Sequence, residues 1–384
     1  MSAAGAGAGA GAALLAALGA AVAGHRGALR EIAVVPALAG LGLPAAGAPG
    51  GPCACCFAPA LVAVVDGGRV AALAAPSLPP LFAHALALVL RARDEGPAVL
   101  ERAMELELAT LAVLLINPGV HAAWAARKRL LVSGSVGAAG ELWATAIVLS
   151  AHPKGGLPFA HRAWVHSVAA AAPAGGVGAG ALASDLAVCE AAARAHPRNY
   201  YAWTHRLRTA RLLGAVDGGR QKRDALVAAE LDASETYVRG HPGDHCALHY
   251  RAALVELAAG PPGTAVPAEA ADRELRLAGR LAAAYEGHEA LWRYRRRALA
   301  WAVAAPRSAD DAAGAAARVL AADAQFADAR LALASATLAG IADRPAPGSL
   351  QDRAMERWEL ERRHATDHAR HLAVRYPEGV HAPH

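Results

Sequence analysis

The stretch HPRNYYAWTHR (His196–Arg206) decides the fold of this chain. A proline disfavours helical backbone in the residue before it, so Pro197 predicts that one helix ends at the start of the stretch. Asn199 can cap a second helix by accepting a backbone N–H. Trp203 begins an apolar face on that second helix, and Arg206 lies nearly one turn further along. The stretch therefore predicts a helical hairpin.

The same pattern occurs in four other stretches, namely NPGVHAAWAAR (Asn117–Arg127), HPKGGLPFAHR (His152–Arg162), HPGDHCALHYR (His241–Arg251) and YEGHEALWRYR (Tyr285–Arg295). The bulky anchors of the five copies are spaced 35, 44, 45 and 44 residues apart, and they are Trp124, Phe159, Trp203, Leu248 and Trp292. The arginines keep the same spacing at Arg127, Arg162, Arg206, Arg251 and Arg295. A period in this range is typical of stacked repeats, in which each hairpin buries its apolar face on the next. Because anchor and arginine recur in every copy, we interpret both as structural.

Regions outside the clear copies divide the chain further. Residues 1–24 are Ala/Gly-rich, and we expect them to be disordered. In residues 25–94, β-branched runs and an Asp66-Gly67-Gly68 turn predict short strands and a small hairpin. Residues 95–340 hold the repeats, five clear copies and a weak sixth. Residues 341–384 are read as a linker and a charged C-terminal helix.

Composition excludes several function classes. The net charge is +5, and no window combines dense Lys/Arg with aromatic residues as nucleic-acid-binding surfaces do. No apolar run of spanning length is free of charges, so a cytoplasmic protein is expected. A nucleic-acid-binding helical repeat is also disfavoured, because the first helices are mostly alanine. No Gly-rich phosphate loop and no catalytic constellation stands out.

Metal sites are not predicted, although the chain has 17 histidines. The five cysteines (Cys53, Cys55, Cys56, Cys189 and Cys246) lack paired zinc-site spacing and are read as free thiols. Two histidine series could align ligands on a helix face, His241/His245/His249 and His364/His368/His371. A Pro-Gly turn breaks the first series. The second lies in the charged terminal helix, which we expect to be exposed to solvent.

The repeat signature resembles that of the protein prenyltransferase α-subunit family. The pattern is complete at Pro197, Trp203, His205 and Arg206, and related strings recur across residues 25–340. The resemblance implies an all-α fold, a right-handed α-α superhelix (solenoid) of helical hairpins. It also implies a heterodimer in which this chain is the non-catalytic subunit. It would wrap the Rab geranylgeranyltransferase β subunit, which would hold the zinc and the active site.

The implied reaction is geranylgeranyl transfer from geranylgeranyl diphosphate to C-terminal cysteines of protein substrates, with no cofactor on this chain. The family places a Lys-Asn-Tyr pattern of the second repeat near the isoprenoid diphosphate. Lys154 matches the lysine, but Gly155-Gly156 replaces Asn-Tyr and Leu157 follows. Tyr200, in the third repeat, keeps the Asn-Tyr pattern. The alternative for Lys154 is an ordinary surface lysine, and for Tyr200 a packing or capping role.

A second function class remains open, a non-enzymatic helical scaffold that binds protein partners. Tetratricopeptide scaffolds have a 34-residue period. Three of the four intervals here are 44 or 45 residues, which favours the prenyltransferase α-subunit interpretation.

Overall fold

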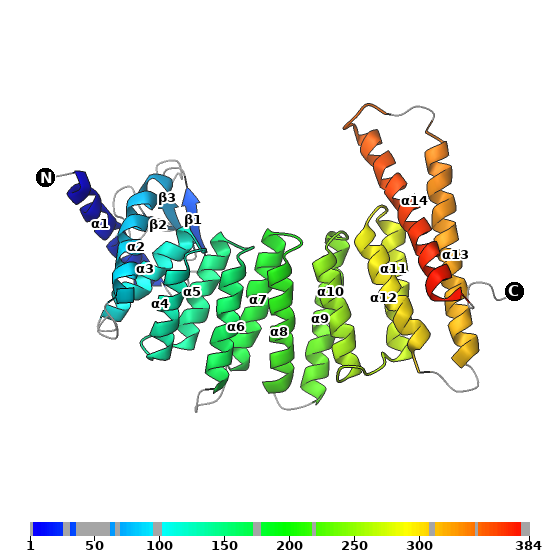
Figure 1. Cartoon of the computed structure of the whole chain (residues 1–384), viewed down its shortest axis with the longest axis horizontal. Coiled ribbons are helices and arrows are strands. Elements are labelled where there is room, and N and C mark those ends of the chain that lie inside the picture. Colours follow the sequence, from blue (N-terminus) through cyan, green and yellow to red (C-terminus); the bar gives the residue numbers. More distant parts are fainter. Residues whose placement is uncertain are drawn as a thin grey trace. The chain divides into compact units, whose positions relative to one another are not determined.

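The computed structural model describes residues 3–25, 31–35, 62–65, 70–94, 102–171, 178–216, 220–306, 312–341 and 345–377. The chain divides into two compact units, residues 1–209 and 210–384, and the division falls within helix α8 (Tyr200–Val216). Each unit is mainly helical (Figure 1). Each also has its own apolar core.

Among its described residues, the first unit contains a small three-stranded sheet, seven complete α-helices and the start of an eighth. Its strands are β1 (Glu31–Val35), β2 (Val62–Val65) and β3 (Val70–Ala74). Before the division its helices are α1 (Ala3–His25), α2 (Leu78–Asp94), α3 (Ala103–Ile116), α4 (His121–Val132), α5 (Ala138–Ala151), α6 (Gly156–Ala171), α7 (Ala179–Ala195) and the start of α8.

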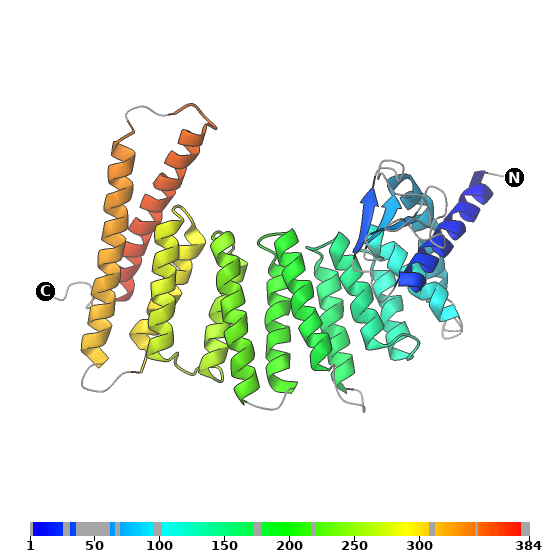
Figure 2. The same cartoon turned by 180° about the vertical axis from the view of Figure 1, so that it is seen from behind.

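The second unit continues with helices alone among its described residues. They are α9 (Arg220–Gly240), α10 (His245–Ala259), α11 (Ala268–Ala284), α12 (Glu289–Ala304), α13 (Ala312–Ala339) and α14 (Leu350–Arg375). Figures 1 and 2 show α13 and α14 as a hairpin that is longer than the α11–α12 hairpin.

The helices pack in sequential pairs. In the first unit α3 packs on α4 and α5 on α6, and the hairpins touch through α3 with α5 and α5 with α7. In the second unit α9 packs on α10, α11 on α12 and α13 on α14, and α12 touches both α10 and α14. This order, in which each hairpin covers its neighbour, is that of a helical-repeat solenoid.

The turns between paired helices end one helix and start the next. After α7 ends at Ala195, the side chain of Asn199 accepts the backbone N–H of Ala202 at 3.2 Å. The corresponding residue before α10 is Asp244, which accepts the backbone N–H groups of Cys246 and Ala247 at 3.0 and 3.1 Å. A short polar side chain at this position satisfies the orphan donors of the helix start.

The N-terminal sheet has the strand order β1-β3-β2. Strands β2 and β3 pair antiparallel, with Val65 opposite Val70, which matches the hairpin that the sequence predicts; the Asp66-Gly67-Gly68 turn itself lies outside the described residues. Strand β1 adds to β3 in parallel. Ile32 and Leu73 are buried, so the sheet contributes to the core of the first unit.

The Ala/Gly-rich N-terminal stretch forms helix α1 rather than the expected disordered tail, and α1 packs on α2 and α3. Its apolar residues explain the difference, because Leu14, Leu18 and Val22 recur every fourth position and are buried. The glycines permit close approach: a Cβ on Gly19 would lie 2.8 Å from a methyl of Leu108 in α3. Alanine adds its high helix propensity.

Two further sequence expectations concern the cysteines and the membrane. Cys189 and Cys246 are buried and form no disulfide within the described residues, and Cys53, Cys55 and Cys56 lie outside them. Among the helices that the structure describes, none has the length and apolar character needed to cross a membrane.

Candidate functional site

The five signature anchors lie in the interior. Trp124, Phe159, Trp203, Leu248 and Trp292 are each no more than 5% exposed. Two of the indole N–H groups are also bonded: that of Trp124 donates to the carbonyl of Pro118 at 2.8 Å, and that of Trp292 to Glu361 at 3.2 Å. Buried aromatic side chains of this size dominate local packing, so the anchors hold the hairpins together.

Each signature arginine is buried and reaches back to the first helix of its own hairpin. The acceptor is always the backbone carbonyl 20 residues earlier, that of Glu107, Leu142, Leu186, Leu231 and Leu275 for Arg127, Arg162, Arg206, Arg251 and Arg295. In three hairpins the guanidinium also donates to the hydroxyl 17 residues earlier, that of Thr110, Thr145 or Ser234. The arginine therefore fixes the two helices of one hairpin.

Buried carboxylates on the first helices connect one hairpin to the next. We call Glu141, Asp185, Glu230, Glu274 and Asp323 the acid row; each is no more than 6% exposed. The arginine of the preceding hairpin pairs with four of them, Arg127 with Glu141 at 2.9 Å, Arg162 with Asp185, Arg251 with Glu274 at 2.8 Å and Arg295 with Asp323 at 2.6 Å. Such charge-assisted bonds are stronger than neutral ones, so they lock the stacking of hairpins.

The residue just before the signature arginine binds the same acid row. His161 lies 2.9 Å from Glu141, His205 lies 2.8 Å from Asp185, and Tyr250 and Tyr294 donate to Glu230 and Glu274. Each of these donors follows its acid by 20 residues. In the last four copies of the signature, the His or Tyr and the arginine that follows it therefore have a structural role.

The last hairpin corrects one expectation about the C-terminal histidines. His368 in α14 is fully buried and lies 2.6 Å from Asp323 in α13, where it completes the acid row. The expectation that this histidine series is solvent-exposed is wrong for His368 and His364. Helix α14 is rich in charged residues, so the sequence suggested exposure on all sides. Most of these charges lie on its outward face, and the buried face carries polar side chains such as His368.

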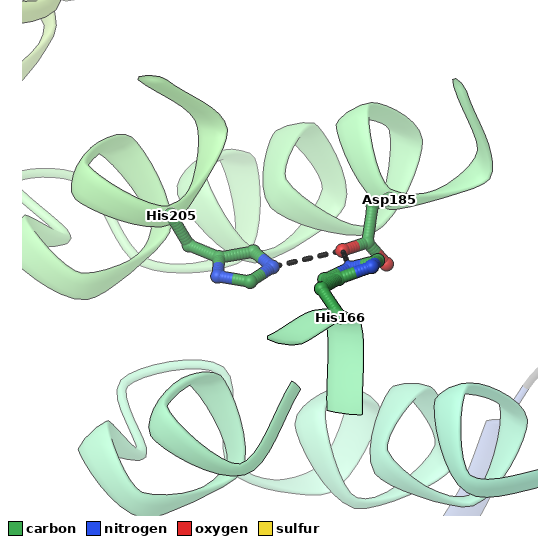
Figure 3. A group of neighbouring side chains, drawn as sticks. All are labelled: His166, Asp185 and His205. Atoms are coloured by element: carbon green, nitrogen blue, oxygen red, sulfur yellow. Dashed lines mark hydrogen bonds and ion pairs between the residues drawn. The ribbon is translucent and has the colours of Figure 1, made fainter. Parts of the chain in front are cut away.

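One position of the acid row has an additional ligand-type side chain (Figure 3). Asp185 Oδ2 lies 2.6 Å from Nε2 of His166 and 2.8 Å from Nε2 of His205, and its Oδ1 pairs with Arg162. His166 comes from α6, Asp185 from α7 and His205 from α8. All of these residues are at most 4% exposed.

Both imidazoles of this cluster are neutral at ordinary pH. Burial lowers the pKa of His205 to about 3 and that of His166 to about 4, and nearby arginines add to the effect. Each neutral ring can donate its Nε2–H to the carboxylate, which leaves Nδ1 as an acceptor. At Glu141, burial raises the carboxyl pKa, but the bond from His161 and the charge of Arg127 outweigh it and bring the pKa below its usual value.

Two imidazoles and a carboxylate are a ligand set that zinc accepts, and the three donor atoms lie within 4.8 Å of one another. However, both oxygens of Asp185 are already bonded within the chain, one to Arg162 and one to the two histidines. A divalent cation would also face the buried guanidinium of Arg162. The cluster is thus better explained as one position of the acid row.

The two residues expected near a diphosphate lie on neighbouring turns. Lys154 is exposed in the turn before α6, and Tyr200, at the start of α8, is 63% exposed. The turns are tied together, because the side-chain amide of Asn199 donates to the carbonyl of Pro153 at 2.6 Å. This bond places the backbone around Lys154 directly beside the start of α8.

Gly156 stands where the family pattern has a tyrosine, and the ring of Tyr201 lies against it. A Cβ on Gly156 would lie 2.8 Å from Cζ of Tyr201, so the Tyr201 ring packs directly against the backbone of α6 where a side chain would otherwise stand. The Tyr200 ring meets Tyr201 edge-on, with centroids 5.6 Å apart. The turn of Lys154 is therefore flanked by aromatic side chains from the third repeat.

Sequence reasoning missed the acid row and His166. The sequence does contain a signal for four acids of the row. Each of them lies 20 residues before the His or Tyr that it bonds, whereas Asp323 lies 45 residues before His368. His166 has no equivalent in the other copies, and no periodic signal marks it.

Comparison with known proteins gives the same repeat. The model of the protein prenyltransferase alpha subunit repeat matches residues 182–212, which include Asp185, Trp203, His205 and Arg206. The chain is 29% identical over 229 residues to protein prenyltransferase alpha subunit repeat-containing protein 1 of Danio rerio, covering 49% of this chain and 52% of that protein. The repeat-containing protein 1-B of Xenopus laevis is 27% identical over 234 residues, covering 49% of this chain and 53% of that protein. The repeat-containing protein 1 of Homo sapiens is 28% identical over 161 residues, covering 38% of this chain and 39% of that protein.

The chain spans about half the length of the curated relatives that it matches. Within the matched repeat the anchor Trp203 is buried, His205 bonds Asp185, and Arg206 donates to the carbonyl of Leu186. The chain therefore carries the protein prenyltransferase alpha subunit repeat, and over about half its length it is similar to proteins named for that repeat.

Proposed function

We propose that this chain is the α subunit of a heterodimeric protein geranylgeranyltransferase, whose partner is a catalytic β subunit of the Rab type. The observation that carries the proposal is the repeat itself, in which anchor, histidine, arginine and acid are assembled within the residues that match the prenyltransferase α-subunit repeat. The zinc and the catalytic residues are expected on the partner, and the protein substrates carry C-terminal cysteines.

The edge formed by the turns before α6 and α8 is the part of this chain that we assign to the substrate. Lys154 offers an exposed ammonium group, and the flanking Tyr200 offers a phenol. A cation placed there would stabilise the negative charge that develops on a departing diphosphate. The bond between Asn199 and Pro153 ties the two turns together, which supports assigning Lys154 and Tyr200 to one edge.

Co-expression with a Rab-type β subunit tests the proposal. We expect a stable 1:1 complex by size exclusion with light scattering, and transfer of a geranylgeranyl group to a protein with C-terminal cysteines. Elution of the two proteins in separate peaks would refute the α-subunit function and would favour the scaffold.

Within such a complex, Lys154→Ala should lower the transfer rate about tenfold, because one charge that stabilises the transition state is lost. The matched control is Lys222→Ala, which removes an exposed lysine from α9. Complex formation should be unchanged for both variants. Equal rates for the two variants would assign Lys154 to the ordinary surface.

A further inference from the structure

The second helices of the first unit share one continuous exposed surface. Lys128 of α4 lies over the ring of Trp164 in α6, 5.1 Å from its centroid. On the other side of α6, Arg208 of α8 donates to Ser167 at 2.9 Å and to the carbonyl of Ala163 at 3.3 Å. These contacts place side chains from three successive second helices side by side. We call this surface the α4–α6–α8 face.

The α4–α6–α8 face is positively charged. Helices α4 and α6, residues 200–209 of α8 and the turns before these helices contain neither Asp nor Glu. Lys128, Lys154, Arg198 and Arg208 are all exposed. Within the part of the chain that the structure describes, Lys128 and Arg208 form no ion pair with a carboxylate. Their charges are therefore available to a partner.

The second unit has a different arrangement at the same repeat position. Arg297, two residues after its signature arginine, pairs at 2.6 Å with Glu256, five residues after the preceding signature arginine. Arg208 holds the place of Arg297 and reaches back by the same 41 residues, but its acceptor is the hydroxyl of Ser167. The first unit thus has a neutral residue where the second has a neutralising carboxylate.

Other residues of the α4–α6–α8 face suit a protein interface. Tyr201 is 43% exposed and lies on the same stripe of α8 as Arg208, and Val132, one turn beyond Lys128, is 71% exposed. On α6, the part of the face between these larger side chains consists of small residues, Ala160 and Ser167. Protein interfaces are enriched in aromatic residues and arginine and poor in carboxylates, which is the composition found here.

We propose that the α4–α6–α8 face docks a carboxylate-rich surface of a partner protein. This inference rests on the proposed function, under which that partner is the β subunit. Four exposed cations spread over three helices and their turns are too sparse for the phosphate ladder of a nucleic acid, which favours dense basic runs. An acidic protein surface would instead supply a few carboxylates at matching positions and would leave room for apolar contact at Val132 and Tyr201.

The test is the association rate constant of this chain with the Rab-type β subunit, measured by stopped flow at about 50 mM and 300 mM salt. Complementary charges accelerate association at low salt. The variant Lys128→Glu/Arg208→Glu should associate about tenfold or more slowly than the wild type at the lower salt, and salt should affect it little. Lys128→Gln/Arg208→Gln should give an intermediate rate, and circular dichroism should show an unchanged helix content for both.

The matched control is Arg91→Glu/Lys222→Glu, which makes the same change of net charge at exposed positions of α2 and α9. It should associate within about twofold of the wild type, since electrostatic steering depends on where the charges lie. A wild-type complex whose rate is equally insensitive to both reversals would overturn the docking surface and leave the α-subunit function standing.

If the wild type forms no complex with the β subunit, the α-subunit function fails and a second probe still decides the docking surface. A fluorescein-labelled peptide of twelve glutamates should bind the wild type at low salt and should bind Lys128→Glu/Arg208→Glu at least tenfold more weakly than the control pair. Equal binding to both variants, or tighter binding of a twelve-nucleotide oligouridine than of the peptide, would overturn the inference.

Discussion

Replacing Asp185 by asparagine tests whether the acid row holds the repeats together. The substitution keeps the size of the side chain and removes its charge. Arg162, which is 2% exposed, would then lie buried without its counter-ion, and His166 and His205 would lose a strong acceptor. Removing one partner of a buried ion pair costs about 3–5 kcal/mol, so the free energy of unfolding should fall by that amount.

The assay is urea unfolding followed by circular dichroism, in which the midpoint should move down by about 1 M or more. The matched control is Glu105→Gln in the same unit, where an exposed pair with Arg102 at 3.5 Å is broken; we expect a loss below about 1 kcal/mol. A loss of less than about 1 kcal/mol for Asp185→Asn would refute the structural role of the acid row.

A double-mutant cycle measures the coupling energy of the Arg162–Asp185 pair apart from the effect of each single substitution. Arg162→Met alone leaves Asp185 with two neutral histidines, and Asp185→Asn alone leaves the guanidinium uncompensated. Combining them removes both charges, and replacing a buried ion pair by uncharged groups is often close to neutral. The double variant should therefore be more stable than the sum of the single losses by about 1–3 kcal/mol, and strict additivity would contradict the pairing.

Two further predictions concern pH and a turn. Because the folded-state pKa values of His166 and His205, about 4 and about 3, lie below the ordinary 6.5, the unfolded state binds more protons as pH falls below 6.5. The free energy of unfolding should therefore drop between pH 7.5 and 5.0, by about 2 kcal/mol for each imidazole, and His166→Gln should flatten the profile; equal slopes for both proteins would contradict this. Gly287→Ala should destabilise by about 2–3 kcal/mol in thermal unfolding, since φ is 78° and the new Cβ would lie 2.8 Å from a backbone oxygen of α14. Gly134→Ala, at φ 76° with open space around it, should cost only about 1 kcal/mol, so equal losses would show that crowding plays no part.

The hairpins were predictable because their signals are local. Pro197 and Asn199 act on the residues next to them, and the apolar stripe that follows Trp203 depends only on helical periodicity. The same local reasoning failed for residues 1–24, where low complexity suggested disorder. There the apolar residues at every fourth position and the small residues between them decide the outcome, because they let α1 approach α2 and α3 closely.

The partners of the arginines were harder to predict for a physical reason. Within one hairpin the distance from acid to His or Tyr is fixed at 20 residues by two helices and a short turn. Between hairpins it depends on the connecting segment: Glu141 follows Arg127 by 14 residues, whereas Asp185 follows Arg162 by 23. No single offset identifies the acid, so only the folded chain shows which carboxylate each arginine meets.

The acid row also indicates where function lies in this protein. The arginine that recurs in every hairpin, such as Arg206, is buried and bonded to the neighbouring helix, so its recurrence reflects the packing of the repeats. A binding surface needs residues that break the pattern and reach solvent. Lys154 and Ser167 do both, since Ser167 stands where the second unit has Glu256, and both lie on the turns and second helices of the first unit. In a repeat protein of this kind, the departures from the repeat are therefore the residues to mutate first in a search for function.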